Sequence, residues 1–128
     1  MPLENSKSLS IVIPVFNEIN FLYKLFDQIK SYFNSENIEI IVVDDGSHDN
    51  SVEQLLAIKS EFPQLRILTH QKCCGQSASI ITGVKAAQAG VIVTLDGDGQ
   101  NDPKDIHKLI NIYFKNDDII LVLSLIHI

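Results

Sequence analysis

The chain has 128 residues, of which 45% are hydrophobic and 20% are charged, and its formal net charge is −6 at pH 7. These values predict one globular domain over residues 1–128 and exclude a disordered chain. The negative charge and the lack of a basic run argue against nucleic acid as a partner. The residues before Ser10 lack the basic and apolar regions of a signal peptide, and we expect a cytoplasmic protein.

The first strand and helix are predicted from Ser10 to Phe33. Ser10–Val15 is an apolar, β-branched run that predicts a strand with an abrupt end at Pro14. Large apolar residues then recur at three- and four-residue spacing from Phe21 to Phe33, which predicts an amphipathic helix. Residues 17–20 supply candidate caps for its first turn.

The second unit begins with Ile38–Val43, which predicts a buried strand. The next helix is predicted from Val52 to Phe62, with Ser47 or Asp49 as its cap and a stop at Pro63.

The third unit consists of a short strand over Leu65–Thr69, a loop over His70–Gly75 and a helix over Gln76–Ala89. This helix is rich in small residues, which allow it to pack close to a sheet, and Gly90 is expected at its C′ position.

The fourth unit begins with Val91–Leu95, a β-branched run that predicts a buried parallel strand. Asp102-Pro103 has the residue types of an N-cap and first helical position, and Ile119–Leu123 is a candidate fifth strand. Four β-α units in succession predict an α/β fold, with an open, mostly parallel sheet and helices on both faces. The loops that follow the strands then meet at one edge of the sheet.

Two carboxylates at this edge follow the fourth strand. Asp96 and Asp98 are separated by Gly97 and lie on the same side of an extended backbone, because side chains alternate with period two. Like charges this close repel each other unless something positive neutralises them. A hard divalent cation with a phosphate ligand would do so, whereas the alternative is a polar turn that caps a helix.

A second acidic turn, Asp44-Asp45-Gly46-Ser47, follows the second strand. A carboxylate at a strand end can accept hydrogen bonds from a nucleobase or a ribose, and the alternative is an Asx or Ser cap at a helix entry. After the first strand, Phe16 is a candidate for stacking on a base and Glu18 for accepting a hydrogen bond from it. The alternative is a core phenylalanine with a first-turn glutamate that the helix dipole favours.

The remaining chemistry-bearing residues give weaker signals. Cys73 and Cys74 are adjacent and cannot join distant segments, and no other Cys or His lies at zinc spacing, so we expect no zinc site. The sequence contains neither a G-x-G-x-x-G fingerprint nor a P-loop. No Ser-His-Asp arrangement can be argued from its scattered histidines.

The four strand-end segments together resemble the amino-terminal part of a family 2 glycosyltransferase, an inverting, nucleotide-sugar-dependent class with the GT-A fold. The matching segments are "SIVIPVFNE", "EIIVVDDGSHDNS", "GQSASIITGVKAA" and "VIVTLDGDGQNDP", in the family's order and spacing. The combination of the last two is most similar to the branch that makes polyprenyl-phosphate sugars, the dolichyl- and undecaprenyl-phosphate mannosyl- and glycosyltransferases. The resemblance thus implies a Rossmann-like nucleotide-binding half.

The resemblance also implies a role for each matching residue. Positions that line the nucleotide pocket correspond to Pro14, Phe16 and Glu18, and the base- and ribose-binding turn to Val43, Asp44 and Asp45. The D-x-D motif corresponds to Asp96, Gly97 and Asp98. The implied cofactor is Mg²⁺ or Mn²⁺, with Asp96, Asp98 and Gln100 as candidate metal ligands.

The implied reaction moves a sugar from a UDP- or GDP-linked donor to an acceptor, for which we expect a polyprenyl phosphate used in cell-envelope or glycoconjugate synthesis. A lipid-phosphate acceptor is already an anion at neutral pH, so a general base is not required. Membrane contact, at the cytoplasmic face, is expected only of a full-length form.

The stretch Ile119–Ile128 lacks the basic acceptor-side pattern of the family, which predicts a chain truncated at its carboxyl end, with the acceptor half and its catalytic residues missing. An alternative is therefore an inactive donor half that binds only nucleotide and metal. A phosphatase-type hydrolase, with Asp96 as nucleophile, fits less well because three β-α units precede the motif.

Overall fold

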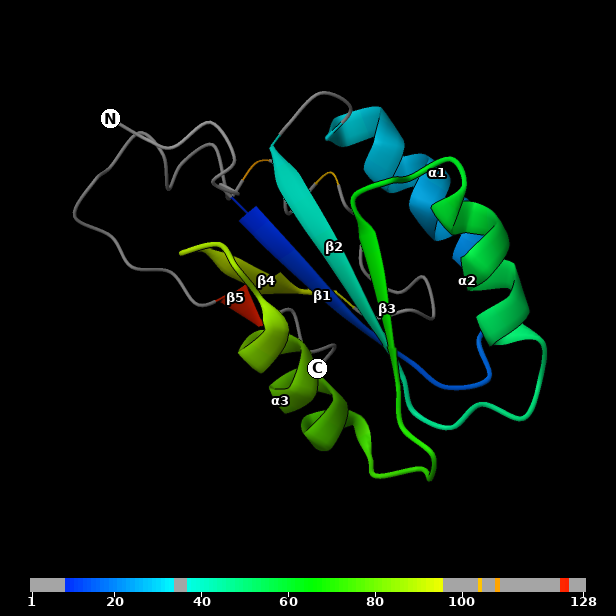
Figure 1. Ribbon diagram of the computed structural model, residues 1–128. Coiled ribbons are helices and arrows are strands. Elements are labelled where there is room, and N and C mark those ends of the chain that lie inside the picture. The colour runs from blue at the N-terminus through cyan, green and yellow to red at the C-terminus, as the bar shows by residue number, and fades with distance from the viewer. Residues whose placement is uncertain (1–8, 34–36, 96–103, 105–107, 109–122, 125–128) are drawn as a thin grey trace.

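A parallel sheet forms the centre of this protein in the computed structural model, which describes residues 9–33, 37–95, 104, 108 and 123–124. Its strands lie in the order β3-β2-β1-β4-β5, and all four pairings are parallel. The predicted open, parallel α/β architecture is confirmed (Figure 1). The strands are β1 (Leu9–Val15), β2 (Ile38–Asp44), β3 (Leu65–Thr69), β4 (Ile92–Thr94) and β5 (Leu123–Ser124).

Helices cover both faces of the sheet, as the sequence predicts. Figure 1 shows α1 (Leu22–Tyr32) and α2 (Ser51–Lys59) on one side and α3 (Gln76–Ala86) on the other. The two faces arise from the period-two alternation of strand side chains. Ile11 and Ile13 belong to the larger core beneath α1 and α2, whereas Val12 belongs to a second core on the α3 side.

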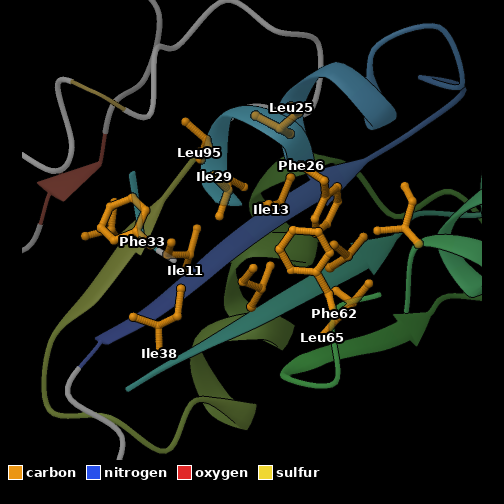
Figure 2. Close-up of a cluster of buried hydrophobic side chains, with 14 of the residues drawn as sticks. Ile11, Ile13, Leu25, Phe26, Ile29, Phe33, Ile38, Phe62, Leu65 and Leu95 are labelled. Atoms are coloured by element: carbon orange, nitrogen blue, oxygen red, sulfur yellow. The ribbon is translucent and has the colours of Figure 1, made fainter. Parts of the chain in front are cut away.

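The larger core is built from aromatic and branched side chains of α1, α2 and the sheet (Figure 2). The rings of Phe26 and Phe62 meet edge to face, with centroids 5.4 Å apart and planes at 68°. Full burial of a side chain such as Phe26 stabilises the fold by about 2–3 kcal/mol. This core therefore holds β1 and β2 rigid, and the loops that follow them begin from fixed points.

The α3 helix packs unusually close to β1 because two small residues, Ser79 and Gly83, face the sheet and are buried. A Cβ atom on Gly83 would lie 2.4 Å from Val12 Cγ1, so only glycine fits there without a shift. The expected close approach of a small-residue helix to the sheet is confirmed.

The sequence predicts that the first strand stops at Pro14, but β1 continues to Val15. The reason is the direction in which Pro14 faces. The backbone groups of Ser10 and Val12 form hydrogen bonds with the chain of β4. Because the backbone groups of a strand alternate in direction, the nitrogen of Pro14 lies on this same side. The pairing with β4 ends at Val12, so no ladder hydrogen bond is lost at Pro14.

The third helix ends at Ala86, so the prediction of a helix to Ala89 with Gly90 at C′ is wrong. Ala87 is extended, and the next two backbone N–H groups are taken by side chains of the sheet. Gln88 N–H donates to Glu39 Oε2, and Ala89 N–H donates to Ser10 Oγ over 3.2 Å. These long-range bonds draw the chain away from the helix toward β4.

The helix starts also differ from the prediction. Phe21 occupies the N-cap of α1 without a side-chain bond, so residues 17–20 do not cap it. The N-cap of α2 is Asn50, without a side-chain cap hydrogen bond, so the prediction of Ser47 or Asp49 as the cap is wrong. Asp49 Oδ1 instead accepts the N–H of Ser51 over 2.9 Å in the turn that leads into the helix. The α2 helix ends at Lys59, before Pro63. The predicted helix from Asp102 lies almost wholly outside the described residues, as does most of the predicted strand Ile119–Leu123; β5 is Leu123–Ser124.

Candidate functional site

The loops after β1, β2 and β3 meet at the carboxyl edge of the sheet, where open α/β sheets bind ligands. Residue 95 reaches the same edge after β4, because Leu95 N–H donates to the carbonyl of Val12 over 2.9 Å. The chain enters the Asp96-Gly97-Asp98 segment directly from this point. These three residues and Gln100 lie outside the described residues, so their assignment stays a prediction.

The first two loops are joined through Asn17 and Ser47. Asn17 N–H donates to Ser47 Oγ over 2.9 Å, and Asn17 Oδ1 accepts the N–H groups of His48 (2.8 Å) and Asp49 (3.3 Å). Asn17 has φ 51°, the left-handed region that asparagine tolerates better than most residues. From the sequence, Asn17 is only a candidate helix cap, and no local pattern predicts this connection.

A second set of bonds fixes the beginning of α1 against the beginning of α2. Glu18 N–H donates to Ser51 Oγ over 3.2 Å, and Ile19 N–H donates to Asp49 Oδ2 over 3.3 Å. Burial raises the pKa of Asp49, but hydrogen bonds from Ser51 and Ile19 outweigh it and leave the pKa below its usual value. The side chain of Glu18 is thereby held at the edge, where its Oε1 lies 3.4 Å from the backbone nitrogen of Phe16.

Phe16 is 39% exposed, so the alternative of a core phenylalanine is wrong. Its ring meets His48 edge to face, with centroids 6.4 Å apart and planes at 79°. An exposed aromatic ring at a strand end has a face available for a planar ligand. Pro14 and Val43, the other apolar residues expected near a nucleotide, pair with each other in register and are both buried.

The two aspartates of the β2 turn have different surroundings, although both are buried. Among the described residues, the carboxylate of Asp44 accepts hydrogen bonds from Ser47 alone: from its N–H over 3.1 Å at Oδ2 and from its hydroxyl at Oδ1. This is the turn-stabilising arrangement that the sequence analysis considered as an alternative to ligand binding. It leaves the expectation of a nucleotide contact at Asp44 untested.

Asp45 binds the loop that follows β3. Its Oδ1 lies 2.8 Å from both Cys74 N and His70 Nδ1, and its Oδ2 accepts Gly75 N–H over 2.8 Å and the Cys73 thiol over 3.3 Å. Burial raises the pKa of Asp45, but these hydrogen bonds outweigh it and lower the pKa to about 2. Asp45 is therefore a carboxylate at all physiological pH values.

His70 and Thr82 extend this network, and the sequence analysis missed both. His70 Nε2 lies 2.9 Å from Thr82 Oγ1, and the Thr82 hydroxyl donates to the carbonyl of Ala78 over 3.0 Å. Because Thr82 is bound within its own helix, this Thr-His-Asp chain does not present a nucleophile. The position of His70, directly after β3, was the available signal, since it placed His70 at the same edge as Asp45.

The donor set expected for a cation is carboxylate and amide oxygen from Asp96, Asp98 and Gln100, which suits Mg²⁺ or Mn²⁺. In the described residues, β4 brings the chain at Leu95 to the carboxyl edge next to the end of β1, directly before these candidate ligands in the sequence, and their role stays a prediction. Within the described part of the chain, no helix combines the length and the apolar character needed to cross a bilayer.

These observations define an α/β domain of the Rossmann-like kind, with a ligand edge formed by three interconnected loops. Comparison with known families identifies it further: residues 10–128 match the family described as glycosyl transferase family 2. The chain belongs to this family. The resemblance of the strand-end segments is thereby confirmed.

Two curated relatives illustrate the match. A dolichol-phosphate mannosyltransferase of Pyrococcus furiosus is 36% identical over 111 residues, which cover 87% of this chain and 31% of the relative. An undecaprenyl-phosphate 4-deoxy-4-formamido-L-arabinose transferase of Aeromonas hydrophila is 35% identical over 117 residues, which cover 89% of this chain and 36% of the relative. The chain thus spans about a third of the length of these relatives.

Solved structures show the same fold. S. aureus TarS 1-349 superposes with a TM-score of 0.70 at 16% identity, covering 86% of this chain and 33% of the 1-349 chain. The mannosyltransferase PcManGT from Pyrobaculum calidifontis, in complex with GDP-Man and Mn²⁺, superposes with a TM-score of 0.66 at 20% identity, covering 73% of this chain and 28% of PcManGT. These likenesses confirm the GT-A fold expected from the sequence.

Proposed function

We propose that this chain carries the donor-binding part of an inverting glycosyltransferase that moves a sugar from a UDP- or GDP-linked donor to a polyprenyl phosphate. The observation that carries the proposal is the convergence of the first three strand-end loops on one edge, beside the end of β4. The named activities of the two curated relatives, which act on dolichol or undecaprenyl phosphate, support the choice of acceptor.

The donor would lie across the ends of β1 and β2. Phe16 offers its exposed face to the base, and Glu18, Asp44 and Asp45 offer carboxylate oxygens to base or ribose hydroxyls. Pro14 and Val43 shape the floor from within the sheet. The rigid core beneath these strands holds the groups in place before the donor arrives, which lowers the entropy cost of binding.

A Mg²⁺ or Mn²⁺ ion would be held against the donor diphosphate by Asp96, Asp98 and Gln100. The solved complex of PcManGT with GDP-Man and Mn²⁺ supports the choice of a divalent cation. When bound, the cation supplies positive charge that stabilises the departing nucleoside diphosphate. An acceptor phosphate oxygen forms a bond to the anomeric carbon as the bond from that carbon to the diphosphate oxygen breaks. The single displacement inverts the configuration and leaves no covalent enzyme intermediate.

Because the acceptor is a lipid phosphate, we place the reaction at the cytoplasmic face of a membrane, with this domain at the surface. The candidate that competes with transfer is a module that binds nucleotide and metal without turnover. This chain spans 31% and 36% of the lengths of the two relatives, so nucleotide binding and sugar transfer are tested separately.

The test is a thermal-shift titration of the chain with UDP and with GDP, with and without Mn²⁺, followed by transfer of labelled sugar to a polyprenyl phosphate. We expect a melting-temperature increase for one nucleotide that requires Mn²⁺ and is lost in Asp98→Ala. Binding without transfer, in this chain and in a full-length form, would identify the noncatalytic module. Turnover of p-nitrophenyl phosphate without nucleotide binding would instead support the hydrolase alternative.

A further inference from the structure

Three potential metal ligands with different donor atoms meet behind the β2 turn. One carboxylate oxygen of Asp45, one ring nitrogen of His70 and the sulfur of Cys74 all lie within 4.8 Å of one another. They come from the end of β2, the end of β3 and the entry to α3, so their spacing in the sequence gives no zinc pattern. The sequence-based expectation of no zinc site considered only local spacing.

The hydrogen bonds around His70 orient its ring for a cation. The Thr82 hydroxyl uses its single hydrogen on the carbonyl of Ala78, so it accepts a hydrogen bond from His70 Nε2–H. In the neutral ring, Nδ1 then directs a lone pair at Asp45 Oδ1, which is 2.8 Å away and can only accept. Nδ1 and Oδ1 are therefore two adjacent ligand atoms that a cation beside them can bind together. A histidine whose outer N–H is bound in this way is the usual form of a metal ligand.

The carboxylate of Asp45 is likewise held in place by its surroundings. The N–H groups of Cys74 and Gly75 each donate to one of its oxygens over 2.8 Å. Asp45 is 4% exposed, so these two hydrogen bonds are shielded from solvent. Such bonds to a ligating carboxylate fix its direction.

The two neighbouring cysteines have different partners. The thiol of Cys74 is exposed and donates only to the carbonyl of Lys72, over 3.3 Å, a weak bond that a side-chain rotation releases. The Cys73 thiol is exposed too, but it donates to Asp45 Oδ2 over 3.3 Å, and it is not one of the three ligand atoms that lie within 4.8 Å of one another. Cys74 is therefore the sulfur ligand, and Cys73 is a matched control one residue away.

We propose that Asp45, His70 and Cys74 bind a thiophilic divalent cation such as Zn²⁺, with a fourth position open to solvent. A mixed oxygen, nitrogen and sulfur set selects Zn²⁺ over Mg²⁺ and Mn²⁺, which prefer oxygen ligands. Binding releases the thiol proton of Cys74 and any proton shared between His70 and Asp45. This site uses none of the ligands expected around Asp98, but it shares Asp45 with the nucleotide contacts proposed above, so the two sites are tested with different variants and different readouts.

The test is titration of the metal-free chain with Co²⁺, which reports a cysteine ligand through a thiolate-to-cobalt absorption band. We expect the band in the unaltered chain and in Cys73→Ser, and its loss in Cys74→Ser. His70→Gln is expected to weaken Co²⁺ binding at least tenfold. Stoichiometric Zn²⁺ should remove the band, whereas a large excess of Mg²⁺ should not.

Two further variants keep the result independent of folding and of the proposed function. Thr82→Val removes the outer bond of His70 without removing a ligand, and we expect weaker binding with the band retained. Asp98→Ala should keep the band unchanged, even where it abolishes Mn²⁺-dependent nucleotide binding. Circular dichroism confirms that each variant is folded. Equal loss in Cys73→Ser and Cys74→Ser, or displacement of Co²⁺ by Mg²⁺, would overturn the proposal.

Discussion

Gly83 of α3 lies directly against Val12 of β1, so close that a Cβ atom on Gly83 would be 2.4 Å from Val12 Cγ1. We expect Gly83→Ala to lower the free energy of unfolding by about 1–3 kcal/mol, as overpacking does, although alanine favours a helix by about 1 kcal/mol. Urea unfolding measures the change. Gly90→Ala is the control, because no atom lies within 4 Å of its added Cβ, and it should have little effect.

The same contact provides a stricter check. Val12→Ala removes the methyl group that the new Cβ would meet, so the double variant with Gly83→Ala should be less destabilised than the sum of the two single variants. Strict additivity would show that the helix moves away from the sheet instead.

Acid should destabilise the protein through Asp45. Its pKa in the folded protein is about 2, below the 3.8 of an unperturbed aspartate, so the unfolded chain binds more protons between these values and stability rises with pH. The contribution, about 2 kcal/mol, is complete above about pH 5 and is lost as the pH falls through 2. Chemical unfolding at several pH values measures this slope.

The pH dependence of the stability of Asp45→Asn should be compared with that of the unaltered chain. Glu39 and Asp49 also have lowered pKa values, but they are present in both proteins, so the difference reports Asp45. The variant should be less stable at neutral pH and should lose less stability on acidification. Identical slopes in the two proteins would contradict the assignment.

Asn17 should show two separable contributions to stability. Asn17→Gly keeps the left-handed backbone but loses the bonds to His48 and Asp49, which we expect to cost about 1–2 kcal/mol. Asn17→Ala also strains the backbone, which adds about 1 kcal/mol. Thermal or urea unfolding ranks the two variants, and an alanine variant as stable as the glycine variant would show that the loop rearranges.

Phe16 should affect ligand binding without affecting stability. If its exposed ring stacks on the base, Phe16→Leu should weaken UDP or GDP binding by about tenfold, since such stacking contributes about 1–3 kcal/mol. Calorimetric titration in the presence of Mn²⁺ measures the affinity. Tyr23→Leu is the matched control, because Tyr23 is an exposed aromatic residue of α1, and it should bind like the unaltered chain.

The sheet was predictable because its central strands are buried on both faces. All residues of β1 and β2 are buried, so these segments appear as mainly apolar, β-branched runs that a local pattern identifies, interrupted by the buried polar residues Ser10 and Glu39. Parallel connections then place their carboxyl ends at one edge, which is why Phe16, Asp44 and Asp45 could be assigned to the same edge of the sheet from the sequence alone.

What escaped prediction depends on contacts between distant segments. The end of α3 is fixed by Glu39 and Ser10, which come from two strands far earlier in the chain. The role of His70 depends on Asp45 and Thr82, and no spacing pattern links the three residues. Local propensity contains no information on such partners, so the loop after β3 was predicted only as a loop.

The strand order also determines how the chain can fold while it is being made. β1 pairs early with β2, but its other edge waits for β4, which follows two further strand–helix units. Until Ile92 has left the ribosome, one edge of β1, which is buried in the finished domain, has N–H and C=O groups without hydrogen-bond partners from β4. Such an edge is a template for pairing with other chains, so a chaperone that shields it during synthesis would act on β1.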